Sequence, residues 1–427
     1  MTLQERDFAV VWHPFTPQKD RKAPIPIVKG EKTLLFDEQG KAYIDAISSW
    51  WVTLHGHANA YIAEKIYKQA LTLEQVIFAG FTHEPAVSLA ERLLPILPNK
   101  FEKIFYSDNG STATEVALKM ALQYWWNLDK QNKRTKIVAF KDAYHGDTFG
   151  AMSVSDRSVF TLAFHDKLFE IIVIDTPTSE NIQQLKKNIQ KQADEIAAFI
   201  YEPLVQGAGG MKIYDALLMD ELLTTIKQNN IICIADEVMT GFGRTGQLFA
   251  SNYLQNKPDI ICLSKGLTGG TMALGVTACT AEIYNAFVND DKLKTFFHGH
   301  SFTANPLACT AALASLDLLL QTPTLTAIEN IAQANKNFAA KFLLNNTSLD
   351  NNIKNVRCLG TILAFEVVVG KDEYLNKIAS VITEKALEKG VYIRPLGNTV
   401  YIMPPYCITD VELQKVYSFL EELIQNI

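Results

Sequence analysis

Two short apolar runs, each ending at one ionisable residue, lie in residues 231–275, IICIADEVMTGFGRTGQLFASNYLQNKPDIICLSKGLTGGTMALG. The first run, IICIA, stops at Asp236, and the second, DIICLS, stops at Lys265. Both runs are rich in β-branched residues and are bounded by polar or glycine-rich segments, so they predict strands of a buried parallel sheet. Ligands bind at the carboxyl ends of such strands. Asp236 and Lys265 are therefore candidates for a binding site.

Lys265 has the surroundings of an amine nucleophile. It leaves a buried strand and enters the turn GLTGG, where loss of water lowers the pKa of an amine and makes it nucleophilic. Asp236 would stand opposite as a fixed anion. A lysine that forms a Schiff base and an aspartate that keeps a pyridine nitrogen protonated are the minimum equipment for holding pyridoxal phosphate as an electron sink. A solvated Asp and Lys in ordinary loops would give the same local pattern, so other parts of the chain decide between the two interpretations.

Composition narrows the class of protein. The chain has 427 residues, 48% of them hydrophobic and 20% charged, which is typical of a globular protein with one large and one smaller domain. A net charge of −6 shows no excess of basic residues for binding nucleic acid or an anionic membrane, so a small substrate is predicted. The N-terminus does not resemble a signal peptide, and no run of about 18 apolar residues occurs, which predicts a cytoplasmic enzyme. The six cysteines form no CxxC pair and predict buried thiols rather than a metal site.

A candidate phosphate site lies in the segment SDNGSTATEVALKMALQYWW. Its apolar residues recur on one face of a helix. Thr112 and Glu115 match a capping box, which places Gly110 and Ser111 at the helix N-terminus. Free backbone N–H groups and the positive end of the helix dipole bind phosphate at such a position. A well-capped helix without a ligand would show the same pattern.

Aromatic residues in two loops are candidates for pocket walls. The strand KIVAF leads into the loop KDAYHGDTFGAMSVS, which contains Tyr144, His145 and Asp147. Tyr144 could stack on a bound ring or pack in the core. Trp50 and Trp51 lie in AISSWWVTLHGHAN, where a loop position favours a flat pocket wall, although paired tryptophans more often fill a core or an interface.

The order of the predicted elements indicates an α/β fold. Strands and helices alternate from residue 105 to 280, which implies right-handed crossovers and a mainly parallel sheet between helices. Residues 1–50 contain short strands and turns that would join a small domain, residues 51–325 would form a large cofactor-binding domain, and residues 326–427 would form the small C-terminal domain. In that last part, VYIRPLGNTVYIMPPY predicts a hairpin.

Taken together, nine segments resemble the class III aminotransferases of the fold-type I pyridoxal-phosphate enzymes: WHPF, SSWW, SDNGSTATEVALKMA, AYHGDTFGAMSVS, EPLVQGAGGM, ADEVMTGFGRTG, LSKGLTGGTMALG, HGHSFTANPLAC and YIRPLGNTVYIMPPY. The similarity runs from about residue 10 to residue 407. DEVMTGFGRTG followed by Lys265 is specific for the class, whereas WHPF, SSWW, GLTGGTMALG and IRPLG resemble the members that act in biotin biosynthesis. The resemblance implies a mainly parallel seven-stranded sheet between helices and a small α+β domain built from both termini.

The resemblance also implies pyridoxal 5'-phosphate as the cofactor and a role for each matching residue. Lys265 would bind the cofactor covalently, and Asp236 would hold its pyridine nitrogen. Gly110 and Ser111 would hold the phosphate. Tyr144 would stack on the cofactor ring and would belong, with Lys265 and Asp236, to the catalytic group.

By the same resemblance, the residues that would bind substrate are Trp50, Tyr144, Asp147, Arg244, Lys265, Gly299, His300, Arg394 and Phe15. Trp50 would wall the substrate channel. Arg394 would clamp a carboxylate, a task that suits a planar guanidinium. Arg244 and Asp147 match further substrate-binding positions.

The resemblance implies a homodimer, because Gly299 and Ser301 would come from the neighbouring protomer and Ser301 would reach the phosphate. The family usually has Pro-Thr where this chain has His300-Ser301, and Tyr where it has Phe15. Ser301 keeps a hydroxyl for the phosphate. Phe15 removes one hydroxyl from the substrate wall, and this bears on the choice of amino donor.

The implied reaction is the amination of 8-amino-7-oxononanoate to 7,8-diaminononanoate, with Lys265 moving the proton as general base and acid. Trp50, Tyr144 and Asp147 favour S-adenosylmethionine as the donor, because aromatic faces and a carboxylate attract its sulfonium. Lysine is the alternative donor for the same reaction. An ω-amino acid aminotransferase or an aminomutase would share every cofactor residue. A non-catalytic nucleotide-binding module is a more remote alternative, since the chain has no GxGxxG or GxxxxGK[ST] fingerprint.

Overall fold

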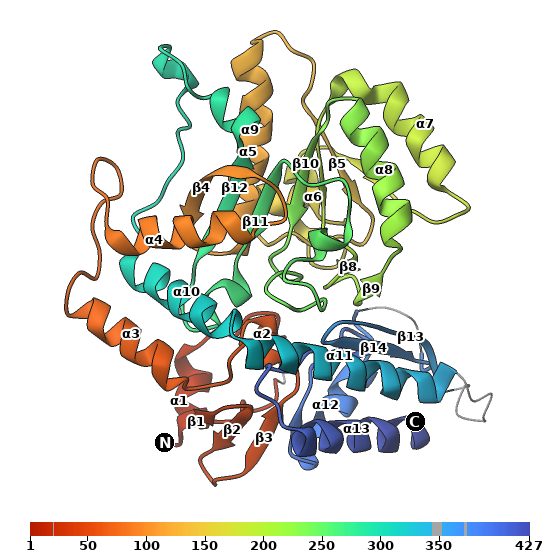
Figure 1. The fold of residues 1–427 in the computed structure, drawn as a ribbon. Helices are drawn as coiled ribbons and strands as arrows, with labels where there is room; N and C mark the ends of the chain where they lie inside the picture. The colour runs from red at the N-terminus through yellow and green to blue at the C-terminus, as the bar shows by residue number, and fades with distance from the viewer. Residues whose placement is uncertain (20, 344–351, 371–373) are drawn as a thin grey trace.

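A seven-stranded sheet in the order β4-β12-β11-β10-β7-β5-β6 is the centre of the computed structural model, which describes residues 1–427 except 20, 344–351 and 371–373 (Figure 1). Neighbouring strands are parallel, except that β12 is antiparallel to β4 and to β11. The predicted mainly parallel α/β sheet is therefore confirmed. Its strands are β4 (Phe101–Ser107), β5 (Lys136–Phe140), β6 (Ile172–Ile174), β7 (Ile196–Tyr201), β10 (Ile232–Asp236), β11 (Ile260–Leu263) and β12 (Gly275–Thr280).

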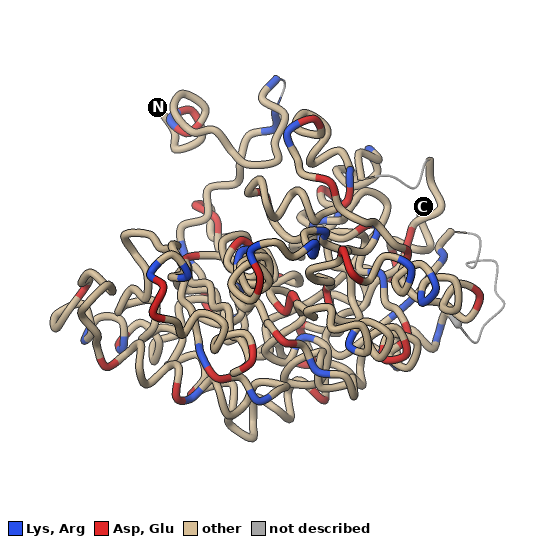
Figure 2. The backbone as a smooth tube through the Cα atoms, turned by 90° about the horizontal axis from the view of Figure 1, so that it is seen from above, with Lys and Arg blue, Asp and Glu red and all other residues tan. Residues whose placement is uncertain are grey.

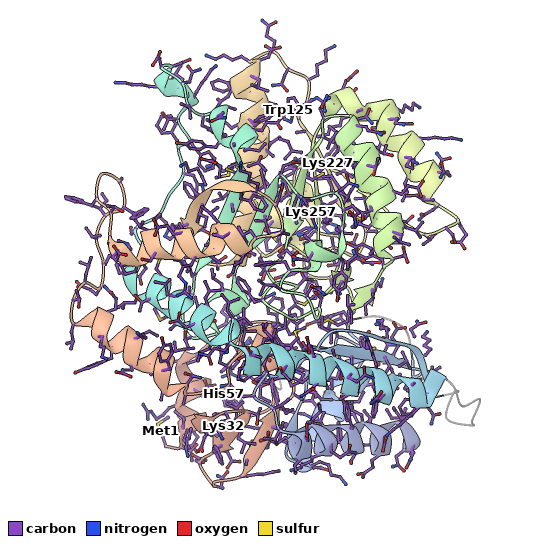
Figure 3. All side chains as sticks on the ribbon, viewed as in Figure 1. Met1, Lys32, His57, Trp125, Lys227 and Lys257 are labelled. Atoms are coloured by element: carbon purple, nitrogen blue, oxygen red, sulfur yellow. The ribbon has the colours of Figure 1, made fainter. Side chains whose placement is uncertain are left out.

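Helices cover both faces of this sheet, which explains why its strands are apolar throughout. Side chains alternate along a strand, so Ile234 of β10 packs in the cluster under helix α5 (Gly110–Leu128), whereas Cys233 packs in the cluster on the other face. Trp125 of α5 donates its Nε1–H to the carbonyl of Ala197 in β7 at 2.9 Å (Figure 3). The other face is covered by α4 (Glu84–Leu93), α7 (Ile182–Gln192), α8 (Ala216–Gln228) and α10 (Pro306–Leu319).

Two smaller sheets lie beside the large one, and one of them combines strands from both ends of the chain (Figure 1). One has the order β1-β2-β3-β15 and the other has the order β13-β14-β16. The exact division of the chain into domains stays a prediction, and helix α11 (Thr322–Leu343) runs across the expected boundary at residue 325. The strands are β1 (Ile27–Glu31), β2 (Leu34–Asp37), β3 (Ala42–Asp45), β13 (Ile353–Leu359), β14 (Ile362–Val367), β15 (Val391–Tyr392) and β16 (Thr399–Ile402).

The remaining elements are short or lie at the edges. The α-helices are α1 (Leu3–Val10), α2 (Ser48–Trp51), α3 (Ala60–Ala70), α6 (Phe149–Val154), α9 (Ala281–Asn285), α12 (Ile378–Glu388) and α13 (Asp410–Gln425), and β8 (Val205–Gln206) pairs with β9 (Lys212–Ile213). The 3-10 helices are η1 (Leu94–Ile96), η2 (Leu162–Lys167), η3 (Ala193–Glu195), η4 (Ala250–Tyr253), η5 (Lys265–Thr268) and η6 (Lys292–Lys294).

Charged residues of both signs are interspersed along the chain (Figure 2). Within the described residues, no single helix has the length and apolar character needed to cross a membrane. Helices α10 and α11 meet those criteria only as a pair, and the pair is bent by 71°.

One local prediction holds only in part and another is wrong. The segment VYIRPLGNTVYIMPPY makes a tight antiparallel turn, in which Leu396 and Thr399 exchange backbone hydrogen bonds of 2.9 and 3.0 Å. Its strands are not hairpin partners, however, because β15 pairs with β3 and β16 pairs with β14, in different sheets. Helix α5 is capped by Asn109, which forms the capping box with Thr112. Glu115 instead accepts hydrogen bonds from the Thr148 hydroxyl and from the backbone of α6, which occupies the second half of the predicted loop.

Candidate active site

A cavity of about 650 Å³ opens where the parallel strands of the large sheet end. Five strands deliver residues to it, because their carboxyl ends meet at one edge of the sheet. Asp236 ends β10, and Lys265 follows β11. The loops after β4, β5 and β7 contribute Gly110, Ser111, Tyr144, His145, Asp147 and Glu202.

Lys265 begins the short helix η5 with a left-handed backbone, at φ 44°. Its Nζ lies 4.5 Å from the ring centroid of Trp51. Burial lowers the pKa of Lys265 to about 8, although the carboxylates of Asp236 and Glu202 act in the opposite direction. An unusual backbone held beside a cavity, together with a lowered pKa, is typical of a reactive lysine.

This pKa predicts the pH dependence of the amine. A lysine with its ordinary pKa near 10.4 has about one neutral amine in 2,500 at pH 7, whereas a pKa of about 8 leaves roughly one in ten neutral. The neutral fraction rises with pH and saturates above the pKa. We therefore expect the rate at which cofactor-free protein couples to pyridoxal phosphate to rise with a midpoint near pH 8, as followed by stopped-flow absorbance. A midpoint near 10 would show that burial does not control this amine.

Asp236 is buried and is held by His145. Its Oδ2 lies 2.7 Å from Nδ1 of His145, and its Oδ1 accepts the backbone N–H of Val238 at 3.1 Å. Nε2 of His145 is buried without a hydrogen-bond partner among the described residues. In the sequence, His145 is evident only as a neighbour of Tyr144, and no pattern there assigns it to the site.

Glu202 is a second buried carboxylate that the sequence analysis missed. Burial raises its pKa to about 7, while His145 lowers the pKa and Asp236 raises it. Its carboxylate accepts the backbone N–H groups of Gly207 at 3.0 Å and Tyr144 at 3.2 Å. A signal was available, because the run AAFIY stops at Glu202 just as IICIA stops at Asp236.

The N-terminus of α5 forms a close-fitting cradle at the cavity. Because Asn109 caps Thr112, the N–H groups of Gly110 and Ser111 have no partner within the helix. A Cβ at Gly110 would lie 2.8 Å from the Val238 side chain, so the backbone can be this close only because the residue is glycine. The Ser111 hydroxyl accepts the backbone N–H of Asp147 at 3.1 Å.

These residues fit pyridoxal phosphate. A single cavity is lined by an amine of lowered pKa, a buried carboxylate and a helix N-terminus suited to an anion. Nε2 of His145, on the ring that holds Asp236, is buried and has no hydrogen-bond partner among the described residues, so a polar group of a ligand can be accommodated there. Lys265, Asp236, Gly110 and Ser111 are the residues that would hold the cofactor.

Residues 15–424 match the family described as "Aminotransferase class-III". The chain belongs to the class III aminotransferases. Enzymes of this class depend on pyridoxal phosphate.

Relatives and a solved structure agree with this family over the whole length of the aminotransferase. An enzyme from Synechococcus elongatus named adenosylmethionine-8-amino-7-oxononanoate aminotransferase is 45% identical, covering 98% of this chain and 99% of its own. One of the same name from Helicobacter pylori is 38% identical, covering 100% and 99%. The crystal structure of the enzyme of that name from Methanocaldococcus jannaschii matches with a TM-score of 0.92 and 36% identity, covering 99% of this chain and 98% of that one.

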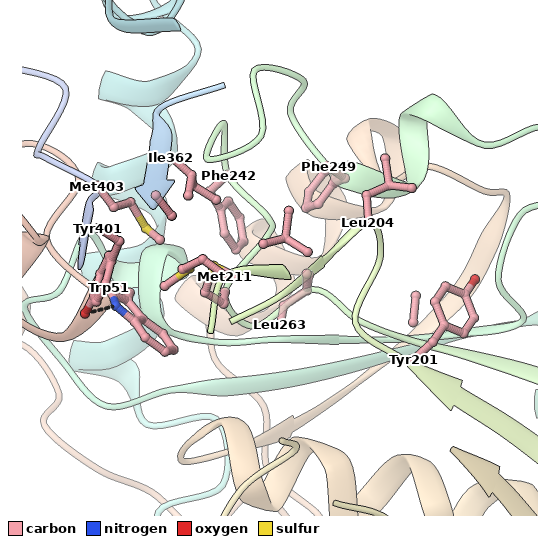
Figure 4. Packing of buried hydrophobic residues seen from close by; sticks show 14 of the residues in the cluster. Trp51, Tyr201, Leu204, Met211, Phe242, Phe249, Leu263, Ile362, Tyr401 and Met403 are labelled. Carbon is pink, nitrogen blue, oxygen red and sulfur yellow. Dashed lines mark hydrogen bonds between the residues drawn. The ribbon is translucent and has the colours of Figure 1, made fainter. Parts of the chain in front are cut away.

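The two tryptophans of the aminotransferase have different places. Trp51 is buried and lines the cavity, and its Nε1–H donates to the hydroxyl of Tyr401 at 2.8 Å (Figure 4). Trp50 does not line this cavity, and 39% of it is exposed. It contacts Phe15, with ring centroids 5.3 Å apart, and the Arg394 guanidinium carbon lies 5.1 Å from its ring centroid. Trp50, Phe15 and Arg394 therefore form an outer cluster, which we call the Trp50 cluster.

Arg244 lies behind the wall of the cavity. Its side chain is fully buried and does not line the cavity of the aminotransferase. The guanidinium donates to the carbonyls of Trp51, Thr53 and Pro404 at 3.4, 3.2 and 3.0 Å. Arg244 thus holds the backbone that carries Trp51, and its part in substrate binding stays a prediction.

Gly299, His300 and Ser301 lie outside the Lys265 cavity of their own chain. They line a separate cavity of about 660 Å³ with residues of the segment 75–79. The side-chain amide of Gln75 donates to the carbonyl of Ser301 at 2.5 Å. Within one aminotransferase chain these three residues are not brought together with Lys265.

Proposed function

We propose that this aminotransferase converts 8-amino-7-oxononanoate into 7,8-diaminononanoate in biotin biosynthesis, with S-adenosylmethionine as the amino donor. The observation that carries the proposal is 45% identity, over almost the full length of both chains, to an enzyme named for these two substrates. Two further relatives of the same name, at 38% and 36% identity, also match along nearly the whole chain.

Different residues of the chain have separate roles in transamination. Pyridoxal phosphate, when bound, supplies an electron sink for the negative charge that forms on a substrate carbon. The Lys265 amine takes the proton from that carbon as a general base and returns a proton as a general acid. Asp236, kept in place by His145, provides the anion for the pyridine nitrogen. Gly110 and Ser111 hold the phosphate.

The Trp50 cluster suits the keto acid. Phe15 and Trp50 offer apolar side chains for an aliphatic chain, and the guanidinium of Arg394, which lies over the Trp50 ring, is the cation of this cluster for a carboxylate. We expect Arg394→Ala to weaken binding of 8-amino-7-oxononanoate by about 2 to 5 kcal/mol, the range for truncating one member of a buried charge pair. Rapid-mixing measurements of each half-reaction check this, since the half-reaction with the donor should change much less.

Arg394→Lys is the matched control, because it keeps the charge but loses the planar fork. Its affinity for 8-amino-7-oxononanoate should lie between that of the wild type and that of Arg394→Ala. Equal damage to both half-reactions in Arg394→Ala would instead mark Arg394 as a structural residue.

A homodimer would complete the site. Ser301 supplies a hydroxyl for the cofactor phosphate only if a second chain brings it to the cavity, because it lies elsewhere in its own chain. Phe297 and Phe302, which flank this segment, are 72% and 62% exposed in the single chain and would be covered by a partner. Light scattering should give the mass of two chains. Mixed dimers of Lys265→Ala and Ser301→Ala chains should regain activity, because one of their two sites is intact.

Lysine is the second candidate for the amino donor. The one observation that favours lysine is Phe15, which lacks the hydroxyl that the family usually has there. A single hydrogen bond contributes about 0.5 to 1.5 kcal/mol, which is too little to reverse a choice made by shape and aromatic walls. The cofactor-loaded enzyme should therefore form 7,8-diaminononanoate, detected by mass spectrometry, from the keto acid and S-adenosylmethionine. Product with lysine alone would overturn the donor, and product with neither would overturn the reaction.

A further inference from the structure

A second cavity, of about 530 Å³, shares Tyr144 with the Lys265 cavity. Its walls come from the segment 155–161, from the loop 208–212 and from the C-terminal part of the chain. Tyr144 therefore stands between two chambers.

Phe160 links the aromatic side chains of this region. Its ring centroid lies 4.5 Å from that of Tyr374, 6.0 Å from Tyr144 and 5.9 Å from Phe15. Phe160 and Tyr374 line the second cavity, and neither lines the first. Flat aromatic faces of this kind stack on heterocyclic bases.

The second cavity also carries one uncompensated negative charge. Of its carboxylates, Asp142 pairs with Lys212 at 2.5 Å, and Glu366 pairs with Arg357 at 3.2 Å. Asp156 is held through its backbone, whose N–H donates to the Ala143 carbonyl at 2.8 Å. Its carboxylate makes no hydrogen bond or ion pair with any other described residue. The cavity therefore favours a cation and disfavours a carboxylate.

The two proposed substrates differ in the features that these chambers distinguish. The keto acid is a narrow aliphatic chain that ends in a carboxylate, and Arg394 in the Trp50 cluster is the cation that suits it. The only lysine or arginine that lines the described part of the second cavity is Lys212, which is already paired with Asp142. The donor carries a purine and a sulfonium cation, which suit Phe160, Tyr374 and Asp156.

We propose that the second cavity binds the nucleoside of the amino donor, while the keto acid extends toward Arg394, so that the two substrates diverge at Tyr144. This assignment rests on S-adenosylmethionine as the donor. Phe160 and Asp156 are then residues that determine donor specificity. Neither lines the Lys265 cavity, although Phe160 packs against Phe15 of the Trp50 cluster with ring centroids 5.9 Å apart.

Separate half-reactions of the cofactor-loaded enzyme test the assignment. Phe160→Leu keeps an apolar side chain but removes the flat aromatic face. It should weaken the binding of S-adenosylmethionine about tenfold, within the range for loss of base stacking. Asp156→Asn keeps the shape of the side chain but removes its charge. It should weaken the binding of the donor up to about fivefold, as for loss of a partly exposed ion pair. The half-reaction with 8-amino-7-oxononanoate should stay within about twofold of wild type in Asp156→Asn, because Asp156 is not part of the Trp50 cluster. In Phe160→Leu it should change less than the half-reaction with the donor, because Phe160 reaches the keto acid only through its packing against Phe15.

Phe164→Leu and Asp166→Asn are matched controls. They make the same chemical changes in the helix η2, where neither residue lines the cavity. Both controls should behave as wild type in both half-reactions. An intact half-reaction with the keto acid also shows that Phe160→Leu and Asp156→Asn are folded, and should one variant fail to fold, the other keeps the test valid.

Adenosine provides an independent probe, because it has the nucleoside but lacks the reacting amino acid. It should compete with S-adenosylmethionine and should not compete with 8-amino-7-oxononanoate. Competition with the keto acid, or equal damage to both half-reactions in Phe160→Leu, would overturn the assignment and leave the donor standing. Failure of the wild-type enzyme to react with S-adenosylmethionine would overturn the donor and the assignment together.

Discussion

Replacing Lys265 by alanine is expected to abolish transamination. The variant loses the only amine of the described residues that lines the cavity with Asp236, and with it the general base for the substrate carbon. Pyridoxal phosphate can still bind through its phosphate and ring, but without a covalent link to the chain. The measurement is the half-reaction with S-adenosylmethionine, together with mass spectrometry of peptides after borohydride reduction.

Lys186→Ala is the control for this experiment. Lys186 pairs with Glu221 between the outer helices α7 and α8, at 2.8 Å, and does not line the cavity. This variant should keep full activity and should retain the cofactor mass on the peptide that contains Lys265. Cofactor mass attached to any peptide of the Lys265→Ala protein would show that a different lysine holds the cofactor.

Asp236→Asn is expected to retain bound cofactor but to lose activity by about 100-fold or more, as when a preorganised electrostatic group is removed from an active site. An amide can still hydrogen-bond to His145, so the local structure should persist. It has no charge, however, and cannot keep the pyridine nitrogen protonated. Steady-state kcat and the amount of bound cofactor are the quantities to measure.

A matched carboxylate lies just before the neighbouring strand. Asp259, which precedes β11 at the far end of the sheet, pairs with Lys227 at 2.9 Å and accepts the N–H of Cys233 at 2.8 Å. Asp259→Asn should lower the melting temperature and leave kcat near wild type. If Asp236→Asn turned over as fast as wild type, the proposed role of this carboxylate would be wrong.

Features encoded by short-range patterns were predictable from the sequence. The apolar runs predicted strands, and parallel strands meet at one edge of a sheet, so the joint placement of Asp236 and Lys265 followed. Gly110 and Ser111 were predicted at the start of a helix, and they remain in the first turn although the cap is Asn109.

Features that depend on distant contacts or unusual backbone were not predictable. Trp50 and Trp51 are adjacent, and which of them faces Lys265 depends on left-handed backbone at Ser48, Ser49 and Trp51, with φ of 53°, 61° and 66°. No sequence period indicates such a kink. The pairing of His145 with Asp236 joins segments that are distant in sequence, as does the anchoring of Arg244 to Trp51.

The pairing of β3 with β15 determines which parts of the protein can fold first during synthesis. Val391 pairs with Ile44 across nearly the full length of the polypeptide, and closing so large a loop is slow compared with local structure formation. During synthesis on the ribosome, the large sheet can form before β15 has been made and can pair with β3. Trp50 lies in α2, the helix that comes after β3, so the substrate wall is expected to form last, after synthesis of the chain is nearly complete. Fragments that end before residue 391 should therefore expose the edge of β3 and be prone to aggregation.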